Sequence, residues 1–179
     1  MPPSARLTLH APSLDATHAI AAAIAGLSRA GDVIVLAGEM GAGKTAFAQG
    51  FGRALGVADP ITSPTFTLVH SYDSPMVTLH HADIYRLEQY AEVADLALGE
   101  LSEFNGIVLI EWGDVVSALL GEHLEVRLVM PDFELEPDDD DDAARVPVAR
   151  DIVLTPGGVP WAARWERLER AVAPWRVPC

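Results

Sequence analysis

The residues with the clearest chemical potential lie between Gly38 and Thr45, where the sequence reads GEMGAGKT and fits the pattern G-x-x-x-x-G-K-[ST]. Glycines in such a segment let the backbone curl until successive N–H groups point at phosphate oxygens. Lys44 can reach the β- and γ-phosphates of a nucleotide, and the Thr45 hydroxyl can ligate Mg²⁺. The segment therefore predicts a phosphate-binding loop (P-loop) for ATP with Mg²⁺, built from Gly38, Glu39, Met40, Gly41, Ala42, Gly43, Lys44, Thr45 and Ala46.

Two carboxylates that follow predicted strands, Asp83 and Glu111, are candidates for the metal side of this site. A P-loop site needs an acid at the end of a neighbouring strand to hold Mg²⁺ or to orient the attacking water. Glu111 follows the apolar run IVLI and is the better match, although it could be an exposed strand-end carboxylate. Asp83 could instead be the N-cap of a helix that begins a few residues later. We expect Lys44, Asp83 and Glu111 to be catalytic, with Thr45, Asp83 and Glu111 at the metal.

Ser63, Thr65 and Trp112 could complete the nucleotide site. A threonine at this distance beyond a P-loop can sense the γ-phosphate as part of a switch loop. Ser-Pro and threonine also form ordinary turns and strand starts, so this alternative stays open. Trp112 could belong to the core or lie against the nucleotide. His80 and His81 are a pair on a predicted strand, where packing is the commoner role, and neither is assigned as a base.

The elements that must position these residues alternate between strands and helices. Val33–Ala37 (VIVLA) predicts a strand buried on both faces, as in a parallel sheet flanked by helices. A helix over 45–55 follows the P-loop and stops at Gly56. The alternation predicts one three-layer α/β domain over 1–179, a P-loop NTPase with a mixed, mainly parallel sheet. Further strands are predicted over 6–10, 65–72, 76–83, 107–110, 124–130 and 146–154, and further helices over 14–27 (N-cap Ser13), 87–101 and 161–172.

Charge excludes one class of function. The net charge is −14, and the segment 134–142 alone carries seven acids and no base, which is typical of a solvated loop. The rest of the chain is still negative. A chain of this sign lacks the basic patch that nucleic-acid binding requires, so we expect the isolated protein not to bind nucleic acid directly.

The composition is that of an ordinary globular protein. No apolar stretch approaches the roughly 18 to 20 residues that span a bilayer, and the N-terminal residues lack the features of a secretory signal. We therefore expect a cytoplasmic protein that does not enter membranes. Cys179 is the single cysteine, which excludes an intrachain disulfide and a cysteine-based metal cluster.

Four motifs, GEMGAGKT, SPTFTLVHSY, HADIYRL and IEWG, occur in this order between Gly38 and Gly113. In this order and spacing they resemble the TsaE (YjeE) family of small bacterial P-loop ATPases. The resemblance implies a protein required for making threonylcarbamoyladenosine in tRNA, which binds ATP with Mg²⁺ and hydrolyses it slowly. It also implies a complex with TsaB and TsaD, in which TsaD transfers the threonylcarbamoyl group.

The resemblance also implies roles for single residues. Thr45 and Glu111 would ligate the metal, Asp83 would be the essential acid, Ser63 and Thr65 would form the switch, and Trp112 would lie near the nucleotide. Tyr85 and Arg86 belong to the same block without a role that we can derive. The segment 134–142 is more acidic than expected for the family.

Two other functions fit a P-loop. A small-molecule kinase would need a lid with arginines that closes over the γ-phosphate. The few arginines after the P-loop are Arg53, Arg86, Arg127 and a C-terminal group, and they form no arginine-rich lid segment. A nucleotide switch that changes partners without useful hydrolysis has no distinguishing sequence feature. Single-turnover hydrolysis, alone and with the partners, separates these alternatives.

Overall fold

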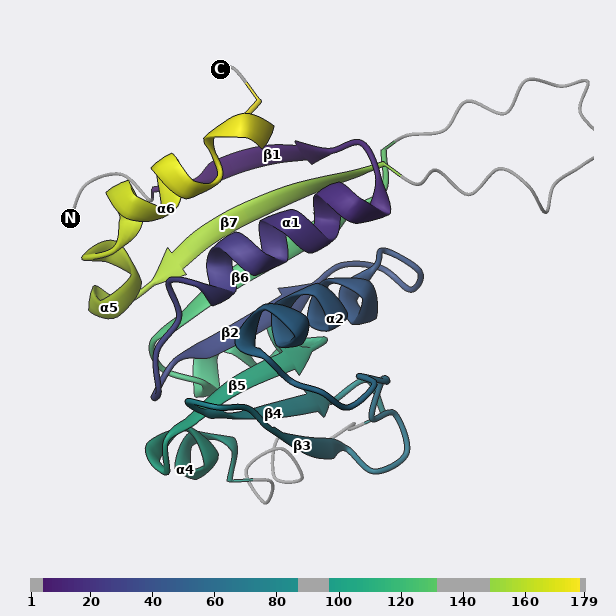
Figure 1. Ribbon diagram of the computed structural model, residues 1–179, viewed down its shortest axis with the longest axis vertical. Coiled ribbons are helices and arrows are strands. Elements are labelled where there is room, and N and C mark those ends of the chain that lie inside the picture. The colour runs from purple at the N-terminus through teal and green to yellow at the C-terminus, as the bar shows by residue number, and fades with distance from the viewer. Residues whose placement is uncertain (1–4, 87–96, 132–148, 178–179) are drawn as a thin grey trace, which may run out of the picture.

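The computed structural model describes residues 5–86, 97–131 and 149–177. Seven strands form one sheet in the order β1-β7-β6-β2-β5-β4-β3 (Figure 1). Within the described residues, no helix is long and apolar enough to cross a membrane. The strands are β1 Leu7–Ala11, β2 Val33–Ala37, β3 Val69–Asp73, β4 Thr78–Asp83, β5 Gly106–Glu111, β6 His123–Val129 and β7 Arg150–Gly157.

The predicted mixed sheet is confirmed, but its mainly parallel character is only partly correct. The four central strands β6, β2, β5 and β4 are parallel neighbours. The outer pairings β1–β7, β7–β6 and β4–β3 are antiparallel. The short turn between β3 and β4 allows only a hairpin, because a parallel connection needs a crossover of a dozen residues or more.

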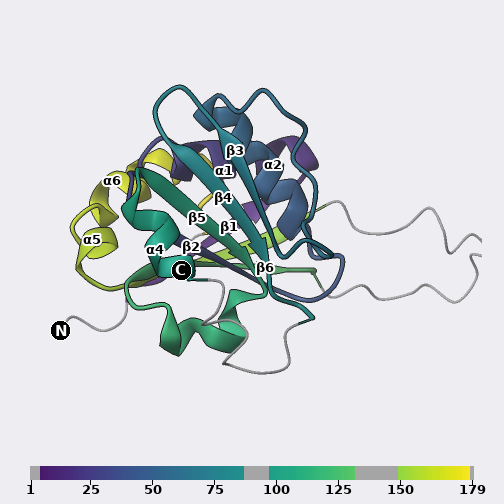
Figure 2. The same ribbon diagram turned by 90° about the horizontal axis from the view of Figure 1, so that it is seen from below.

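Helices cover both faces of the sheet. Helices α1 (Leu14–Ala25) and α2 (Lys44–Leu55) lie side by side on one face (Figures 1 and 2). Alternate residues of β2 point to opposite faces: Ile34 and Leu36 join the core under α1 and α2, whereas Val33 and Val35 join a second cluster. That second cluster includes residues of α4 (Leu98–Glu103) and packs against Leu120, which follows a 3₁₀ helix over Gly113–Leu119. The three-layer prediction is therefore confirmed.

Two predicted helix boundaries, the start of α1 and the end of α2, are accurate. Ser13 is the N-cap of α1, and its Oγ accepts a hydrogen bond from the Ala16 N–H at 3.1 Å. Helix α2 ends at Gly56, which adopts a left-handed conformation (φ 86°) that favours glycine.

Two predicted elements have wrong boundaries, and three further predicted segments lie partly or wholly outside the described residues. The strand predicted over 65–72 begins at Val69, because a tight turn in which Leu68 N–H donates to Pro64 O at 2.7 Å precedes it. The helix predicted over 161–172 is two helices, α5 (Val159–Ala162) and α6 (Trp165–Ala171), followed by a 3₁₀ turn over Ala173–Trp175. Most of the helix predicted over 87–101, the start of the strand predicted over 146–154 and all of the acidic segment 134–142 lie outside the described residues.

The end of the chain is tied to the strand that carries the P-loop. Arg164, between α5 and α6, makes a buried two-pronged ion pair with Asp32, which precedes β2. Its guanidinium also donates to the backbone oxygens of Leu27 and Pro160. These bonds satisfy a buried charge, as burial of an ion pair requires.

Candidate functional site

The P-loop joins β2 to α2 and has the backbone that its glycines predict. Gly38, Gly41 and Gly43 have φ values of 136°, 80° and 100°, in the range that side chains disfavour. A Cβ at Gly38 would lie only 2.3 Å from Leu128 O, so no other residue fits there. Helix α2 starts at Lys44, and its first N–H groups have no carbonyl partner within the helix. The loop and this helix end together can bind an anion.

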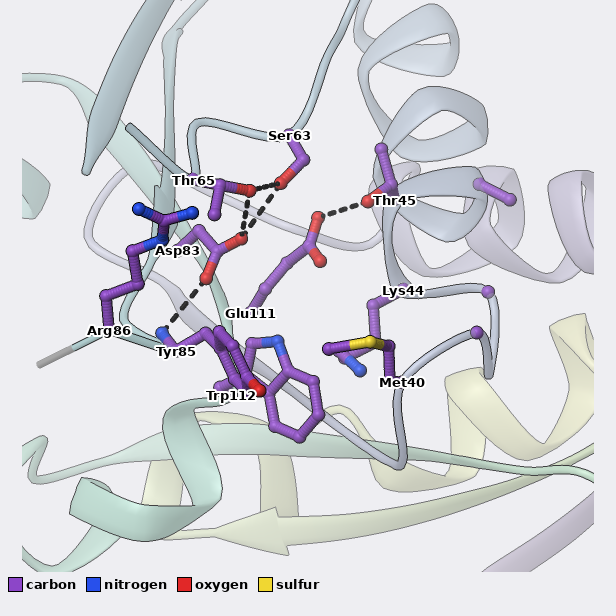
Figure 3. A pocket seen from close by; sticks show the side chains of 13 residues that line it. Met40, Lys44, Thr45, Ser63, Thr65, Asp83, Tyr85, Arg86, Glu111 and Trp112 are labelled. Carbon is purple, nitrogen blue, oxygen red and sulfur yellow. Dashed lines mark hydrogen bonds between the residues drawn. The ribbon is translucent and has the colours of Figure 1, made fainter. Parts of the chain in front are cut away.

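Lys44 is buried against the loop and the Trp112 ring. Its Nζ donates to Gly38 O and to Glu39 O, both at 2.8 Å, and lies 3.6 Å from the centre of the Trp112 ring. Burial lowers the pKa of Lys44 below the ordinary lysine value, and the carboxylates of Glu111, Asp83 and Asp114 oppose that shift. Figure 3 shows the ammonium beneath Met40, beside the pocket.

Asp83 and Glu111 end two neighbouring parallel strands in register, so the structure brings the two predicted acids together. Both are buried, with side chains from different strands meeting at one end of the sheet (Figure 3). Because Glu111 is only 3% exposed, the alternative of an exposed strand-end carboxylate is wrong.

Glu111 is bonded to the start of α2. Its Oε1 accepts a hydrogen bond from Thr45 Oγ1 at 2.8 Å and another from His81 Nε2 at 2.9 Å. His81 is fully buried, and its Nδ1 has no partner among the described residues. The tautomer with the proton on Nε2 therefore leaves no buried N–H unpaired and donates to Glu111.

Asp83 is bonded to the predicted switch residues. Its Oδ2 accepts from Ser63 Oγ at 2.8 Å and from Thr65 Oγ1 at 3.2 Å, and these two hydroxyls are 2.7 Å apart. Its Oδ1 accepts from the Tyr85 N–H at 3.0 Å. One oxygen thus accepts a hydrogen bond from the following turn, while the other holds Ser63 and Thr65 at the site. The helix start that the N-cap alternative requires lies outside the described residues.

Trp112 is both a core neighbour and a wall of the site. Its backbone is left-handed (φ 63°), and its N–H donates to Leu36 O at 2.9 Å. The ring packs against the second core cluster, and its centre lies 4.8 Å from that of Tyr85. The core alternative for Trp112 is therefore confirmed, and its contact with a nucleotide stays a prediction.

These residues line a pocket of about 430 Å³. All predicted site residues take part except Gly38, Glu39 and Ala42; the first two line an adjacent pocket of about 460 Å³, and Ala42 is fully buried. Tyr85 and Arg86, which had no assigned role, also line the main pocket. The Arg86 guanidinium lies over the exposed Phe66 ring, 4.5 Å from its centre.

Two residues that contact the site were not predicted. His81 had a usable signal, because in HHAD it shares a strand face with Asp83 two positions later. Arg150 had no usable sequence signal. Its guanidinium donates to the carbonyl oxygens of Ala42 and Gly41, which precede it by 108 and 109 positions and which only the strand order of the sheet brings near.

The oxygen-bearing side chains at the pocket suit a magnesium ion bound together with a nucleotide. Among the described residues, no three His, Cys, Asp or Glu side chains group to hold a metal by themselves. Mg²⁺ typically takes one or two carboxylates and completes its shell with phosphate oxygens and water. Thr45, Glu111 and Asp83 offer such a partial set beside the phosphate-binding loop.

Comparisons with known proteins agree with these motifs. The family model described as "Threonylcarbamoyl adenosine biosynthesis protein TsaE" matches residues 11–140. The chain is 40% identical over 104 residues to the tRNA threonylcarbamoyladenosine biosynthesis protein TsaE of Bacillus subtilis, a match that covers 58% of this chain and 65% of that protein. It is 42% identical over 107 residues to the protein of the same name from Nostoc, with coverage of 58% and 65%. The matched part thus spans about 65% of the length of these relatives.

The fold also has a solved counterpart. The crystal structure of YdiB from Bacillus subtilis superimposes with a TM-score of 0.74 at 28% sequence identity, covering 95% of this chain and 98% of that one. The family match covers most of the chain and includes the P-loop, both acids and the switch residues. The chain belongs to the TsaE family.

Proposed function

We propose that this protein binds ATP with Mg²⁺, hydrolyses it slowly, and acts with TsaB and TsaD in the synthesis of threonylcarbamoyladenosine in tRNA. One observation carries the nucleotide part of the proposal. Asp83 and Glu111 end adjacent parallel strands in register, directly across from Thr45 at the start of α2. Carboxylate and hydroxyl groups of the kind that Mg²⁺ prefers, beside a loop whose backbone suits phosphates, support the proposed magnesium-nucleotide site.

Each residue has a distinct role in the proposal. Lys44 and the N–H groups at the start of α2 bind the phosphates. Thr45 and Glu111 hold the metal ion, which neutralises charge on the phosphate oxygens. Asp83 positions the attacking water, and Ser63 and Thr65 respond to the γ-phosphate. Trp112 and Tyr85 wall one side of the pocket.

Slow hydrolysis by the isolated chain has a physical reason. Asp83 Oδ2 already accepts hydrogen bonds from two hydroxyl groups. Glu111 Oε1 accepts one from the Thr45 hydroxyl and one from the His81 ring. A carboxylate oxygen that already accepts two hydrogen bonds has little capacity left to accept another from an attacking water. Asp83 can bind a water more freely once Ser63 and Thr65 have left it, which a partner that moves the switch segment would cause.

The surroundings of the pocket support a protein partner. Met40, Phe66 and Tyr85 are apolar side chains exposed by 65%, 84% and 51%. Met40 and Tyr85 line the pocket itself, and Phe66 lies next to its Arg86. Exposed apolar groups gathered at one place are typical of a protein-binding surface. The negative net charge disfavours tRNA as the direct partner.

A titration with a fluorescent ATP analogue tests the nucleotide part. Lys44→Ala should weaken binding about ten- to a hundredfold, because one charge-assisted contact contributes about 1.5 to 3 kcal/mol. Arg53→Ala, at an exposed position late in α2, serves as the control and should bind as the wild type does. Unchanged affinity in Lys44→Ala would refute the assignment of the P-loop.

A further inference from the structure

Arg150, the first residue of β7, contacts the backbone of the P-loop and is 8% exposed. Its Nε donates to Ala42 O at 2.8 Å, and its Nη2 donates to Gly41 O at 3.1 Å. We propose that Arg150 is a positioning residue for the phosphate cradle, which holds two peptide groups of the P-loop in the orientation that phosphate binding needs. This inference rests on the proposed nucleotide binding.

Peptide geometry links these two bonds to the phosphate side of the loop. The described residues contain no cis peptide bond, and in a trans peptide the C=O and N–H groups point in opposite directions. With Ala42 O fixed on Arg150, the N–H of Gly43 faces away from Arg150. Gly43 lines the main pocket, so this N–H is directed to the side where phosphates would bind.

The second bond supports the turn of the loop itself. The peptide that joins Gly41 to Ala42 has its oxygen on Arg150, and its N–H donates to Glu39 O at 3.1 Å. That bond closes the tight turn of the P-loop. Gly41 and Gly43 have left-handed backbones and no side chains, so the turn needs an outside group to fix it.

Two cationic side chains thus bind different carbonyl oxygens of the P-loop. Lys44, which lines the main pocket, holds the oxygens of Gly38 and Glu39. Arg150, which is not among the residues that line this pocket, holds those of Gly41 and Ala42. Lysine must exchange its bonds when a phosphate arrives, whereas Arg150 can keep its own. The planar guanidinium can hold two acceptors at fixed spacing, which an ammonium does less well.

Arg164 provides a matched control, because it is also a buried arginine, at 6% exposed. It bonds Asp32, Leu27 and Pro160 and lines none of the pockets near the P-loop. If Arg150 served only the general stability of the fold, substitutions at the two positions would have the same kind of effect. The proposal requires that they differ in phosphate binding.

The test compares Arg150→Met and Arg150→Lys with Arg164→Met by calorimetric titration. The two probes are Mg-ATP and inorganic tripolyphosphate, which has the phosphate chain without the nucleoside. We expect Arg150→Met to weaken the affinity for each of the two probes about ten- to a hundredfold. Arg150→Lys should keep part of the affinity, and Arg164→Met should bind both probes as the wild type does while unfolding at a lower temperature. If either Met variant does not fold, the Lys variant at the same position takes its place.

A second readout needs no nucleotide. In the free protein, the amide NMR signals of Gly43 and Ala42 should shift or broaden in Arg150→Met and stay in place in Arg164→Met. The inference is overturned if Arg150→Met binds tripolyphosphate within about twofold of the wild type, or if it loses affinity for Mg-ATP alone, which would place Arg150 at the nucleoside. A wild-type protein that binds neither probe would instead refute the proposed function, an outcome distinct from both of these.

Discussion

His81 and Glu111 form a buried pair in which the imidazole Nε2 lies 2.9 Å from the carboxylate Oε1. The same oxygen accepts the Thr45 hydroxyl, so one atom links β4, β5 and the start of α2. A buried carboxylate needs such donors, because an unpaired charge in the interior is costly. The pair therefore fixes where the Glu111 carboxylate, which we propose as a metal ligand, lies relative to the P-loop.

Glu111→Ala should impair Mg²⁺-dependent ATP hydrolysis far more than Mg²⁺-free nucleotide binding, because the carboxylate serves the metal and not the phosphates. Nucleotide titrations with and without Mg²⁺, together with single-turnover hydrolysis, measure both effects. Glu103→Gln, at an exposed position in α4, is the control. Normal turnover in Glu111→Ala would show that the metal-binding acid is a different residue.

His81→Leu should lower the free energy of unfolding by about 1 to 3 kcal/mol, because it leaves a buried carboxylate oxygen with one donor fewer. It should also raise the Mg²⁺ concentration needed for hydrolysis. His80→Leu is the matched control: His80 is only partly buried and bonds Ser71 on β3. Urea denaturation at pH 7 compares the two variants. Equal losses of stability at both positions would argue against a special role for the His81–Glu111 bond.

Lys44 is the only lysine in the sequence, so its titration can be followed alone. We expect its pKa in the free protein to lie below 10.5, because burial disfavours the ammonium. A bound phosphate chain favours the ammonium, so ATP should raise this pKa. Binding then takes up a proton above the lowered pKa, and ATP affinity should fall as the pH rises through that value. NMR of ¹³C-methylated Lys44 reports the pKa directly, and a value that ATP leaves unchanged would place the phosphates elsewhere.

Asp83→Asn tests whether Asp83 does more than cap a turn. A purely local cap would cost about 1 kcal/mol of stability and leave activity intact. We expect hydrolysis to be impaired beyond any loss of stability, because Asp83 Oδ2 also holds Ser63 and Thr65. Ser63→Ala should reproduce part of the effect. Hydrolysis rates at a temperature well below unfolding separate the two possibilities, and a fully active Asp83→Asn would leave only the cap.

The isolated protein should not bind tRNA measurably at physiological salt, because its net charge is −14. It should associate with TsaB and TsaD in a manner that depends on the nucleotide, since Ser63 and Thr65 lie beside the pocket. Pull-downs with ATP, ADP and no nucleotide test this dependence, and a gel-shift assay with tRNA tests the first point. Tight tRNA binding, or partner binding equal in all three conditions, would contradict the mechanism.

Local patterns allowed much of the site to be predicted. The P-loop is continuous in the sequence, and its strand and helix have strong patterns, so β2 matches the predicted range. Asp83 and Glu111 were predictable because acids at the ends of parallel strands meet at one edge of the sheet. Ser63 and Thr65 were named, but the hydrogen bonds that tie them to Asp83 depend on the turn before β3, which reads as strand in the sequence.

The unpredicted features depend on contacts between distant segments. The antiparallel outer strands follow from how β1, β6 and β7 associate, and no local pattern specifies those partners. The break between α5 and α6 occurs where Arg164 turns inward to Asp32, 132 positions away. Arg150 reaches the P-loop for the same reason. Sequence periodicity describes one element at a time and contains no information on such pairings.

The position of β7 has a consequence for synthesis of the protein on the ribosome. Strand β1 pairs with β7 alone among named strands, and Arg150 meets a P-loop made 108 residues earlier. Chains are synthesised from the N-terminus at about 5 to 20 residues per second. Several seconds therefore pass between the synthesis of the P-loop and that of Arg150, which holds two of its carbonyls. A nascent chain that ends before β7 has an unpaired β1 and an unsupported loop. Nucleotide binding would therefore begin only after β7 has been synthesised, and ATP could not assist the folding steps that precede it.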